Sequence, residues 1–420
     1  GLTTVGSRFF ENCAPAAPGS SRLQIETSPK LSNKDPKITK TTKIPEKEIA
    51  AKIECGVATT QFALSTPTLT TAVNTGKLSF WWNWNTDVNL DTTGLDNATL
   101  SAMYATFTPM VWGTGTPPDM SFMKDHEGDV LGFNEPDQYG PACCNCDGKQ
   151  TYAPATSSGW APLFNPSSAS TLWQTLVKLL TAQPTSAGGI RRIISPAMAG
   201  DAVGEPGVDC TKDPAVGNNP HFCHGWLAMF KSFSLKLQCQ DLNGTTTNCW
   251  DAIDSIQIHA YATTAEDVKT KIQSYYKAFQ EDFEGLNGRK KKTLWLTEVA
   301  MGSNNETAVA KFVENLMNPI TGLSNRATAT SGGFGYVSHV SWFSEYFFPA
   351  FNMSGVNLHQ DQSWSSSLFN PYGGLTTVGS SFFENCAPAA PTPPPPPPTP
   401  PGPPTPPTPP PPSPPSPPSP

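Results

Sequence analysis

Two glutamates stand out in the sequence because each one ends or interrupts a run of apolar residues that favours a buried strand. Glu135 follows Asn134 at the end of DVLGFNEP (129–136), and Glu298 lies within TLWLTEVA (293–300). An ionisable side chain in such a setting needs a partner or a chemical role, because burial of an unpaired charge is costly. The alternatives are an exposed loop position for Glu135 and a structural salt bridge for Glu298. Otherwise the two carboxyl groups predict acid–base and nucleophilic chemistry.

Polar and aromatic residues occur at the equivalent place on the other predicted strands, where each apolar run ends. The residues that we expect to bind substrate at this edge are Asn83, Trp112, Asn134, His259, Tyr261 and Trp342. Glycosidic bond cleavage uses two carboxyl groups, one to protonate the leaving oxygen and one to attack or stabilise the anomeric carbon. For the histidine and the two tryptophans, packing in the core is the alternative interpretation.

The elements that must position these residues are short apolar runs that alternate with helical patterns. Seven runs occur, at 79–84, 107–113, 129–136, 192–199, 255–261, 293–300 and 339–344. Helical patterns occupy 170–183, 265–283 and 306–317. Buried strands separated by amphipathic helices are typical of a parallel sheet. We therefore predict an α/β fold, a (β/α)8 TIM barrel, whose strand ends converge on one face. Its remaining strand is expected within 55–78 or 85–104.

The chain divides into four parts. Residues 1–17 and 374–390 have the same sequence except that Arg8 stands in place of Ser381. We expect 1–17 to be the remnant of a preceding repeat domain, and a wall-protein motif reused at both ends is the alternative. Residues 18–54 are predicted to be a disordered linker, and 55–390 the folded domain. Residues 391–420, almost wholly Pro, Thr and Ser, predict a polyproline II tail.

The cysteines and glycosylation sequons indicate a secreted protein of the extracellular space or cell wall. There are ten cysteines, and sequons occur at Asn97, Asn243, Asn305 and Asn352. We expect disulfides between Cys239 and Cys249 and between Cys210 and Cys223, carried by rim loops. Cys55 and Cys386 flank the domain and are candidates to join its ends, although spacing does not fix connectivity.

A metal site and two classes of partner are disfavoured. The zinc candidates match no standard spacing, so we expect disulfides and no metal there; they are Cys143, Cys144, Cys146, His221, Cys223 and His224. The net charge of −7 and the pI of about 5.4 provide no basic field for nucleic acid. No stretch reaches the roughly 18 consecutive apolar residues that would cross a membrane.

An ordered set of motifs carries a family resemblance. The motifs are WNW (82–84), PMVWG (109–113), LGFNEPD (131–137), SPAMA (195–199), IHAY (258–261), WLTEVA (295–300), SWFS (341–344) and GLTTVG (374–379). Over roughly 78–384 the chain resembles glycoside hydrolase family 128, whose members cleave β-1,3-glucans. The resemblance implies a (β/α)8 barrel and a retaining reaction without a cofactor, with Glu135 as acid/base and Glu298 as nucleophile. It also implies that Asn134 contacts the sugar 2-hydroxyl and that Trp112 and Tyr261 face the sugar.

Departures from the family pattern leave the substrate open. Three insertions, at 138–165, 200–222 and 238–248, would reshape the rim, and Ala260 stands where the family often has Trp. We expect a β-glucan as substrate and, through the proline-rich tail, the cell-wall matrix as partner. One alternative is a non-catalytic carbohydrate-binding wall protein, and another is a β-glycanase that acts on a different polysaccharide such as mannan.

Overall fold

The computed structural model describes residues 53–59, 78–88, 95–113, 126–137, 163, 165–182, 189–198, 225–303, 305–343, 367–370 and 374–386. The repeat at 1–17, nearly all of the linker and the proline-rich tail lie outside the described residues. So do Cys210, Cys223, Asn352 and the zinc candidates.

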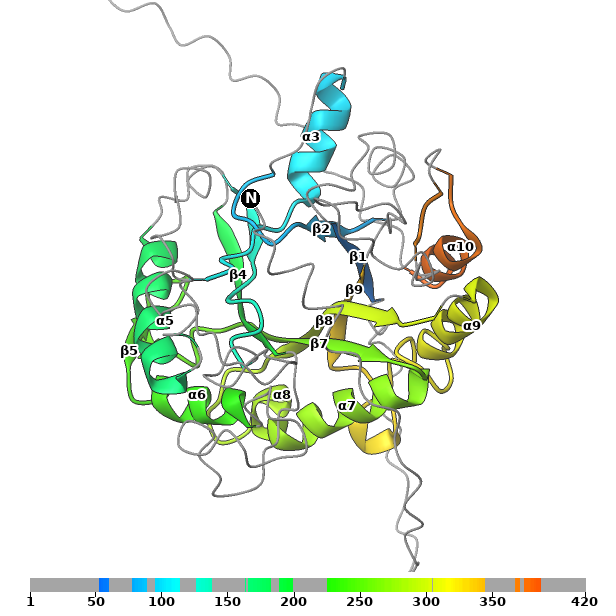
Figure 1. Ribbon diagram of the computed structural model, residues 1–420. Helices are drawn as coiled ribbons and strands as arrows, with labels where there is room; N and C mark the ends of the chain where they lie inside the picture. The colour runs from blue at the N-terminus through cyan, green and yellow to red at the C-terminus, as the bar shows by residue number, and fades with distance from the viewer. Residues whose placement is uncertain are drawn as a thin grey trace, which may run out of the picture.

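Seven strands form one parallel sheet in the order β2-β1-β9-β8-β7-β4-β3. Their bounds are Glu54–Ala58 (β1), Phe80–Trp82 (β2), Gly128–Val130 (β3), Ile190–Met198 (β4), Ser255–Ala262 (β7), Thr293–Met301 (β8) and Val337–Phe343 (β9). Strand β1 lies outside the seven predicted apolar runs. It lies at the start of 55–78, one of the two ranges in which the remaining strand was expected. The sheet curls around a centre, with helices outside it (Figure 1).

The predicted strand at 107–113 forms isolated bridges instead of a named strand. Trp81 of β2 bridges Phe107, and Met110 bridges Leu131 just after β3, both in the parallel sense. The amide of Val111 donates to the carbonyl of Leu131 at 2.9 Å. The segment thus lies between the two edge strands of the sheet.

Helices follow most of the strands, and several of them begin at a side chain that caps the first turn. Their bounds are Asn97–Thr106 (α3), Pro166–Thr181 (α5), Trp226–Ser234 (α6), Ala265–Ala278 (α7), Gln280–Glu284 (α8), Glu306–Leu316 (α9) and Thr377–Glu384 (α10). The caps of α5, α7 and α9 are Asn165, Thr264 and Asn305, whose side chains accept backbone N–H groups of the first turn. These helices contain the three predicted helical patterns, with a break at Phe279 that separates α7 from α8. Within the described residues, no helix has the length and apolar character needed to cross a bilayer.

The core has two layers because successive side chains of a strand point to opposite faces of the sheet. The outer layer lies between strands and helices and contains Trp81, Trp173 and Trp342. The inner layer fills the curl of the sheet and consists of Ala58, Phe80, Trp82, Met110, Leu131, Ile194, Trp295, Ala300 and Phe343. A residue of the inner layer that lies near the carboxyl end of a strand is thus placed to take part in a site.

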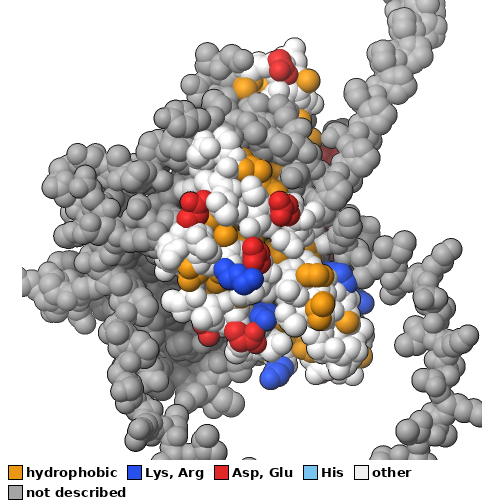
Figure 2. All heavy atoms as spheres, turned by 90° about the vertical axis from the view of Figure 1, so that its right-hand side faces the viewer, with side chains coloured by type: hydrophobic (Ala, Val, Ile, Leu, Met, Phe, Trp, Pro, Cys, Tyr) orange, Lys and Arg blue, Asp and Glu red, His pale blue; other side chains and the backbone are white. Residues whose placement is uncertain are grey.

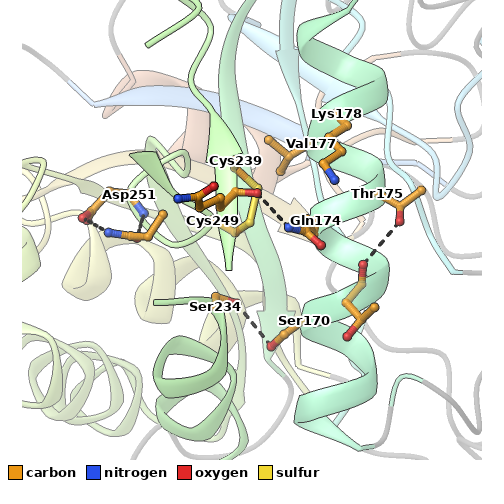
Figure 3. Close-up of a disulfide and its surroundings, with 12 residues drawn as sticks. Ser170, Gln174, Thr175, Val177, Lys178, Ser234, Cys239, Cys249 and Asp251 are labelled. Carbon is orange, nitrogen blue, oxygen red and sulfur yellow. Dashed lines mark hydrogen bonds between the residues drawn. A yellow bond between two sulfur atoms is a disulfide. The ribbon is translucent and has the colours of Figure 1, made fainter. Parts of the chain in front are cut away.

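Within the described residues, two disulfides tie parts of this fold together. Cys239 and Cys249 are bonded, as their spacing predicts, and join strand β5 (Gln238–Gln240) to the residue that follows its hairpin partner β6 (Thr246–Asn248). Figure 3 shows this disulfide beside α5, where the Gln174 side chain donates to the carbonyl of Gln238 at 2.7 Å. The second disulfide bonds Cys55 of β1 to Cys386 after α10, and so joins the two ends of the domain.

Candidate active site

Glu298 faces the inside of the curled sheet because an irregularity in β8 shifts the alternation of its side chains. The pairing of β7 with β8 skips Thr297 and resumes with Glu298 opposite His259. Trp295 belongs to the inner layer before the shift, and Ala300 belongs to it afterwards. A bulge of this kind re-aims the side chains that follow it. Here it brings Glu298 to the inner face.

Two aromatic side chains hold the Glu298 carboxylate, one from the neighbouring strand β7 and one from the residues just after β2. The indole Nε1 of Trp84 donates to Oε1 at 2.9 Å, and the hydroxyl of Tyr261 donates to Oε2. Trp84 has a φ of 55°, in the left-handed region that residues other than glycine rarely adopt. The Phe343 ring makes edge contacts with both donors, at centroid distances of 5.7 Å from Trp84 and 5.6 Å from Tyr261. Both oxygens of the carboxylate are therefore fixed in direction.

Glu135 lies beyond β3, where backbone hydrogen bonds to both sides fix its position. The amide of Asn134 donates to the carbonyl of Trp112 at 3.1 Å, and the amide of Glu135 donates to the carbonyl of Ala197 at 2.9 Å. Glu135 also has a left-handed backbone, with a φ of 43°. Such conformations cost energy and persist where surrounding structure imposes them, often at functional sites. In this conformation the Glu135 carboxyl group reaches His259.

His259 joins the two carboxyl groups. Its Nδ1 lies 2.8 Å from Oε1 of Glu135 and 3.3 Å from Oε2 of Glu298. One atom from each of these three side chains lies within 4.8 Å of the other two. The His259 side chain is fully buried, and those of Glu135 and Glu298 are 12% and 5% exposed. Two glutamates that are distant in the sequence thus form one compact, poorly solvated cluster.

Burial raises the pKa of both carboxyl groups, and their neighbours make the shifts unequal. The pKa of Glu135 is raised to about 8, by burial first and by a nearby carboxylate second. The pKa of Glu298 is raised to about 7, because burial is opposed by His259 and by the hydrogen bonds from Tyr261 and Trp84. Burial also lowers the pKa of His259, which favours the neutral imidazole. Glu298 therefore ionises more readily than Glu135.

The cluster also has the composition of a small cation site. Glu135, His259 and Glu298 each offer a ligand atom that a divalent ion could share. The same three side chains already contact one another, with His259 hydrogen-bonded to Glu135 and 3.3 Å from Glu298. Glycosidic cleavage by two carboxyl groups needs no metal.

Four of the predicted substrate-binding residues lie at this cluster. His259 and Tyr261 contact the glutamates directly, and Tyr261 is 38% exposed. Asn134 precedes Glu135 and is buried, and its Oδ1 has no hydrogen-bond partner within the part of the chain that is described. Trp112 is half-buried and packs against the inner layer. His259 and Tyr261 thus lie against the carboxyl groups and Asn134 lies next to Glu135 in the chain, while a role in substrate binding stays a prediction for all four.

The other two predicted residues have packing roles. The Asn83 side chain donates to two backbone carbonyls of the turn that follows it, at 3.1 and 2.7 Å. Trp342 is fully buried in the outer layer, where its ring lies 6.2 Å from Phe312 of α9 and 5.8 Å from Phe382 of α10. The expectation that Trp342 faces substrate is therefore corrected, because this side chain lies on the helix side of the sheet.

Two residues of the cluster were not among the predicted site residues, Trp84 and Phe343. Trp84 lies two residues after Trp82 of the inner layer, beyond the end of β2 and with a left-handed backbone, so strand alternation does not predict its direction. Phe343 follows from strand alternation once one inward residue of β9 is known. Ser341 accepts a hydrogen bond from Trp82 inside the sheet at 3.1 Å, so Phe343, two residues later, points the same way.

This fold and this pair of buried carboxyl groups define the catalytic core of a glycosyl hydrolase. The family model with that description, "Glycosyl hydrolase catalytic core", matches residues 56–382, and the chain belongs to this family. The resemblance drawn from the sequence motifs is confirmed at that level. No curated protein matches the chain.

The solved structures to which the chain is similar include members of glycoside hydrolase family 128. An endo-β-1,3-glucanase of subgroup II from Sorangium cellulosum is 19% identical, with 79% of this chain and 98% of that chain covered and a TM-score of 0.47. A subgroup IV endo-β-1,3-glucanase from Lentinula edodes is 16% identical, with 78% and 98% covered and a TM-score of 0.47. A subgroup VII oligosaccharide-binding protein from Trichoderma gamsii is 15% identical, with 82% and 97% covered and a TM-score of 0.39.

Proposed function

We propose that the chain is a retaining endo-glycoside hydrolase that cleaves β-1,3-glucan or a related β-glucan by double displacement. The observation that carries this proposal is the separation of the two carboxyl groups, which offer oxygens within 4.8 Å of each other. Retaining enzymes hold their carboxyl groups about 5–5.5 Å apart, whereas inverting enzymes need about 6.5–9.5 Å to admit a water between them. The short separation favours direct attack by a carboxylate.

The hydrogen bonds around the two groups support different roles for them. Glu298 accepts hydrogen bonds from two donors, Trp84 and Tyr261, which stabilise its anion and suit a nucleophile. Within the described residues, the Glu135 carboxyl group has one side-chain hydrogen bond, to His259. The pKa of Glu135 is higher than that of Glu298. A raised pKa keeps a carboxylic acid protonated near neutral pH, as a general acid requires.

The reaction follows from these roles. Glu135 donates its proton to the leaving glycosidic oxygen while Oε1 or Oε2 of Glu298 attacks the anomeric carbon, which forms a glycosyl-enzyme and releases the leaving chain. Glu135, now a carboxylate, takes a proton from water, whose oxygen attacks the same carbon and frees Glu298. Asn134 lies beside this position and has a buried Oδ1 that a sugar hydroxyl could satisfy.

The proposal includes a closed (β/α)8 barrel in which residues 107–111 complete the ring. This segment bridges β2 through Trp81 and Phe107 and bridges the end of β3 through Met110 and Leu131. At the other side of the sheet, β1 pairs with β9, the first strand of the domain with the last. Counted with this segment, the strands follow one another around the ring in chain order, as closure of such a barrel requires.

The substrate class and the setting of the protein are also proposals. The family-128 structures named above include glucanases and an oligosaccharide-binding protein, so a binding-only protein and a β-glycanase for another polysaccharide are the competing functions. We propose secretion to the extracellular space or cell wall, where the proline-rich tail contacts the matrix. Disulfides and the exposed sequon residues Asn97, Asn243 and Asn305 suit that setting.

One experiment separates these functions. The purified chain is incubated with a panel of β-1,3-, β-1,4- and mixed-linkage glucans and with mannan, and the anomer released first is followed by NMR. We expect internal cleavage of a β-1,3-linked glucan with the β-anomer appearing first. Glu298→Gln should bind the same glucan without hydrolysing it, and Glu314→Gln, a surface control on α9, should behave as wild type. Release of the α-anomer, or wild-type turnover by Glu298→Gln, would overturn the mechanism, and binding without reducing-end release would favour the binding protein.

A further inference from the structure

The repeated segment has a known place in the fold at its second occurrence. Residues 374–386 contain α10, which packs on α9 and on the outer face of β9 and ends at the disulfide with Cys55. The surface that receives it is formed by Glu306, Trp342, Leu368 and Phe369, and is called here the α10 site. The same segment occurs at residues 1–13 with a single difference.

The contacts of α10 depend on side chains that the first copy also has. Val378, Phe382 and Phe383 are buried in the outer layer, and their counterparts are Val5, Phe9 and Phe10. Phe382 lies 5.8 Å from Trp342, and Phe383 lies 6.0 Å from Phe369, between ring centroids. The apolar face of the first copy is therefore the one that the α10 site accepts.

The start of α10 is equally reproduced in the first copy. The Thr376 hydroxyl donates to the carbonyl of Leu368 at 3.1 Å and accepts the N–H of Gly379 at 3.0 Å, which caps the helix. The N–H of Thr377 donates to the Glu306 carboxylate at 2.9 Å. Thr3, Thr4 and Gly6 occupy these three positions in the first copy.

Gly379 is the most demanding of these positions. A Cβ atom there would lie 2.0 Å from the backbone carbonyl oxygen of Leu368, a distance that no side chain tolerates. The first copy has glycine at the equivalent Gly6. Glycine disfavours helices, so alanine would be more stable at a helical position that does not approach a backbone carbonyl. Glycine at both positions is thus consistent with the same close approach.

The single difference falls where the α10 site tolerates it. Ser381 is partly exposed, so the longer Arg8 side chain can run along the helix with its charge in water. Figure 2 faces the side of the molecule on which α9 and α10 lie in Figure 1, and shows acidic and basic side chains interspersed there. An additional arginine thus meets no uniform field of like charge.

We propose that residues 1–17 bind the α10 site, in the same chain or in a second copy of it, in place of residues 374–386. Cys13 then takes the position of Cys386 next to Cys55. When the Cys386 thiol is absent, Cys13 and Cys55 lose two protons and two electrons to glutathione disulfide, which becomes two glutathione molecules, and a Cys13–Cys55 bond forms. Residues 1–17 and residues 374–386 are then two segments that can each fill the α10 site of one domain. Exchange of one for the other can link two domains or two molecules.

The test uses the full chain with Cys386→Ser, folded in a glutathione redox buffer and digested without reduction for mass spectrometry. We expect the Cys13–Cys55 disulfide to be the main form of Cys55, with gel filtration showing whether it joins one chain or two. Adding Gly6→Ala should lower the yield of the Cys13–Cys55 disulfide about tenfold, because the new methyl group clashes with the Leu368 carbonyl even though alanine favours a helix. Adding Arg8→Ser should leave this yield unchanged. A folded Cys386→Ser protein with Cys55 free or paired elsewhere would overturn the proposal.

A second measurement covers the case in which Cys386→Ser does not fold. Wild-type protein is incubated with a biotinylated peptide of residues 1–17 in the same buffer. The Cys13 thiolate attacks the Cys55 sulfur and releases the Cys386 thiolate, an exchange without net oxidation. We expect the wild-type peptide to label Cys55, and a Gly6→Ala peptide to label it about tenfold less. Equal labelling by both peptides would contradict binding at the α10 site.

Discussion

The indole of Trp84 donates a 2.9 Å hydrogen bond to Glu298 across 214 positions of the sequence. This contact brings the second tryptophan of the WNW motif to the cluster of Glu135, His259 and Glu298 as a hydrogen-bond donor.

Trp84→Phe and Tyr261→Phe should each lower kcat/KM by removing one donor from the Glu298 carboxylate. Loss of a hydrogen bond to a charged group costs about 1.5–3 kcal/mol, or roughly 10–100-fold. Since these bonds lower the pKa of Glu298, each variant should also shift the acidic limb of the pH–rate profile to higher pH. Steady-state kinetics over pH measures both effects. A fall in rate with an unmoved acidic limb would mean that the aromatic ring only shapes the site.

The wild-type pH profile should be bell-shaped and centred near neutrality. The proposed mechanism requires Glu298 ionised and Glu135 protonated, and their pKa values are raised to about 7 and about 8. The profile of kcat/KM should thus rise through the first value and fall through the second. An optimum near pH 4–5 would show that the carboxyl groups titrate like ordinary solvated glutamates.

Glu135→Gln should stabilise the fold at alkaline pH. The folded-state pKa of Glu135 lies above that of the unfolded chain, so its contribution to stability is complete below about pH 4.5 and is lost as pH rises through about 8. The amide has no such loss, and we expect a gain of about 1–3 kcal/mol at pH 8 and little change at pH 4. Chemical denaturation at both pH values measures it, with Glu314→Gln as the exposed control. A constant difference at all pH values would contradict the assignment.

Trp342 and Phe343 are neighbours with opposite expected effects. Trp342→Ala should lower the free energy of unfolding by about 3–5 kcal/mol, because it leaves a cavity between β9 and the helices, while the folded protein keeps its kcat/KM. Phe343→Ala should lower kcat/KM, because the ring orients both donors to Glu298. Urea unfolding and initial rates at a temperature where both variants are folded separate the two. Intact kcat/KM in Phe343→Ala would exclude its positioning role.

The two disulfides should differ in what they contribute to stability. Cys55 and Cys386 are separated by 331 residues and Cys239 and Cys249 by 10, and cross-links that close longer loops restrict the unfolded chain more. The Cys55→Ser/Cys386→Ser pair should cost about twice the roughly 3 kcal/mol expected for Cys239→Ser/Cys249→Ser. Thermal unfolding of both double variants measures the two losses of stability. A larger loss in the Cys239→Ser/Cys249→Ser variant would contradict the prediction.

The parts of this protein that depend on local pattern could be predicted from the sequence. The apolar runs gave the positions of six of the seven sheet strands, the spacing of Cys239 and Cys249 indicated their bond, and the strand-end positions of Glu135 and Glu298 marked them as chemical groups. Each of these signals lies within about ten residues of chain, where alternation, helical period and loop length act directly. The segment 107–113 was predicted as a full strand and forms only bridges.

Which side chains face one another was decided by the tertiary structure. Strict alternation from Trp295 would have placed Thr297, and not Glu298, inside the sheet, and only the skipped pairing with β7 reverses this. The left-handed backbones of Trp84 and Glu135 likewise turn their side chains toward a partner that is distant in sequence. Trp342 and Phe343 are both aromatic residues at a strand end, and the sequence offers no local reason to prefer one. The curvature of the sheet and the irregular strand pairing depend on all strands together. The sequence of one strand therefore determines which chemical groups are present, and the packing of the strands determines which of these groups face one another.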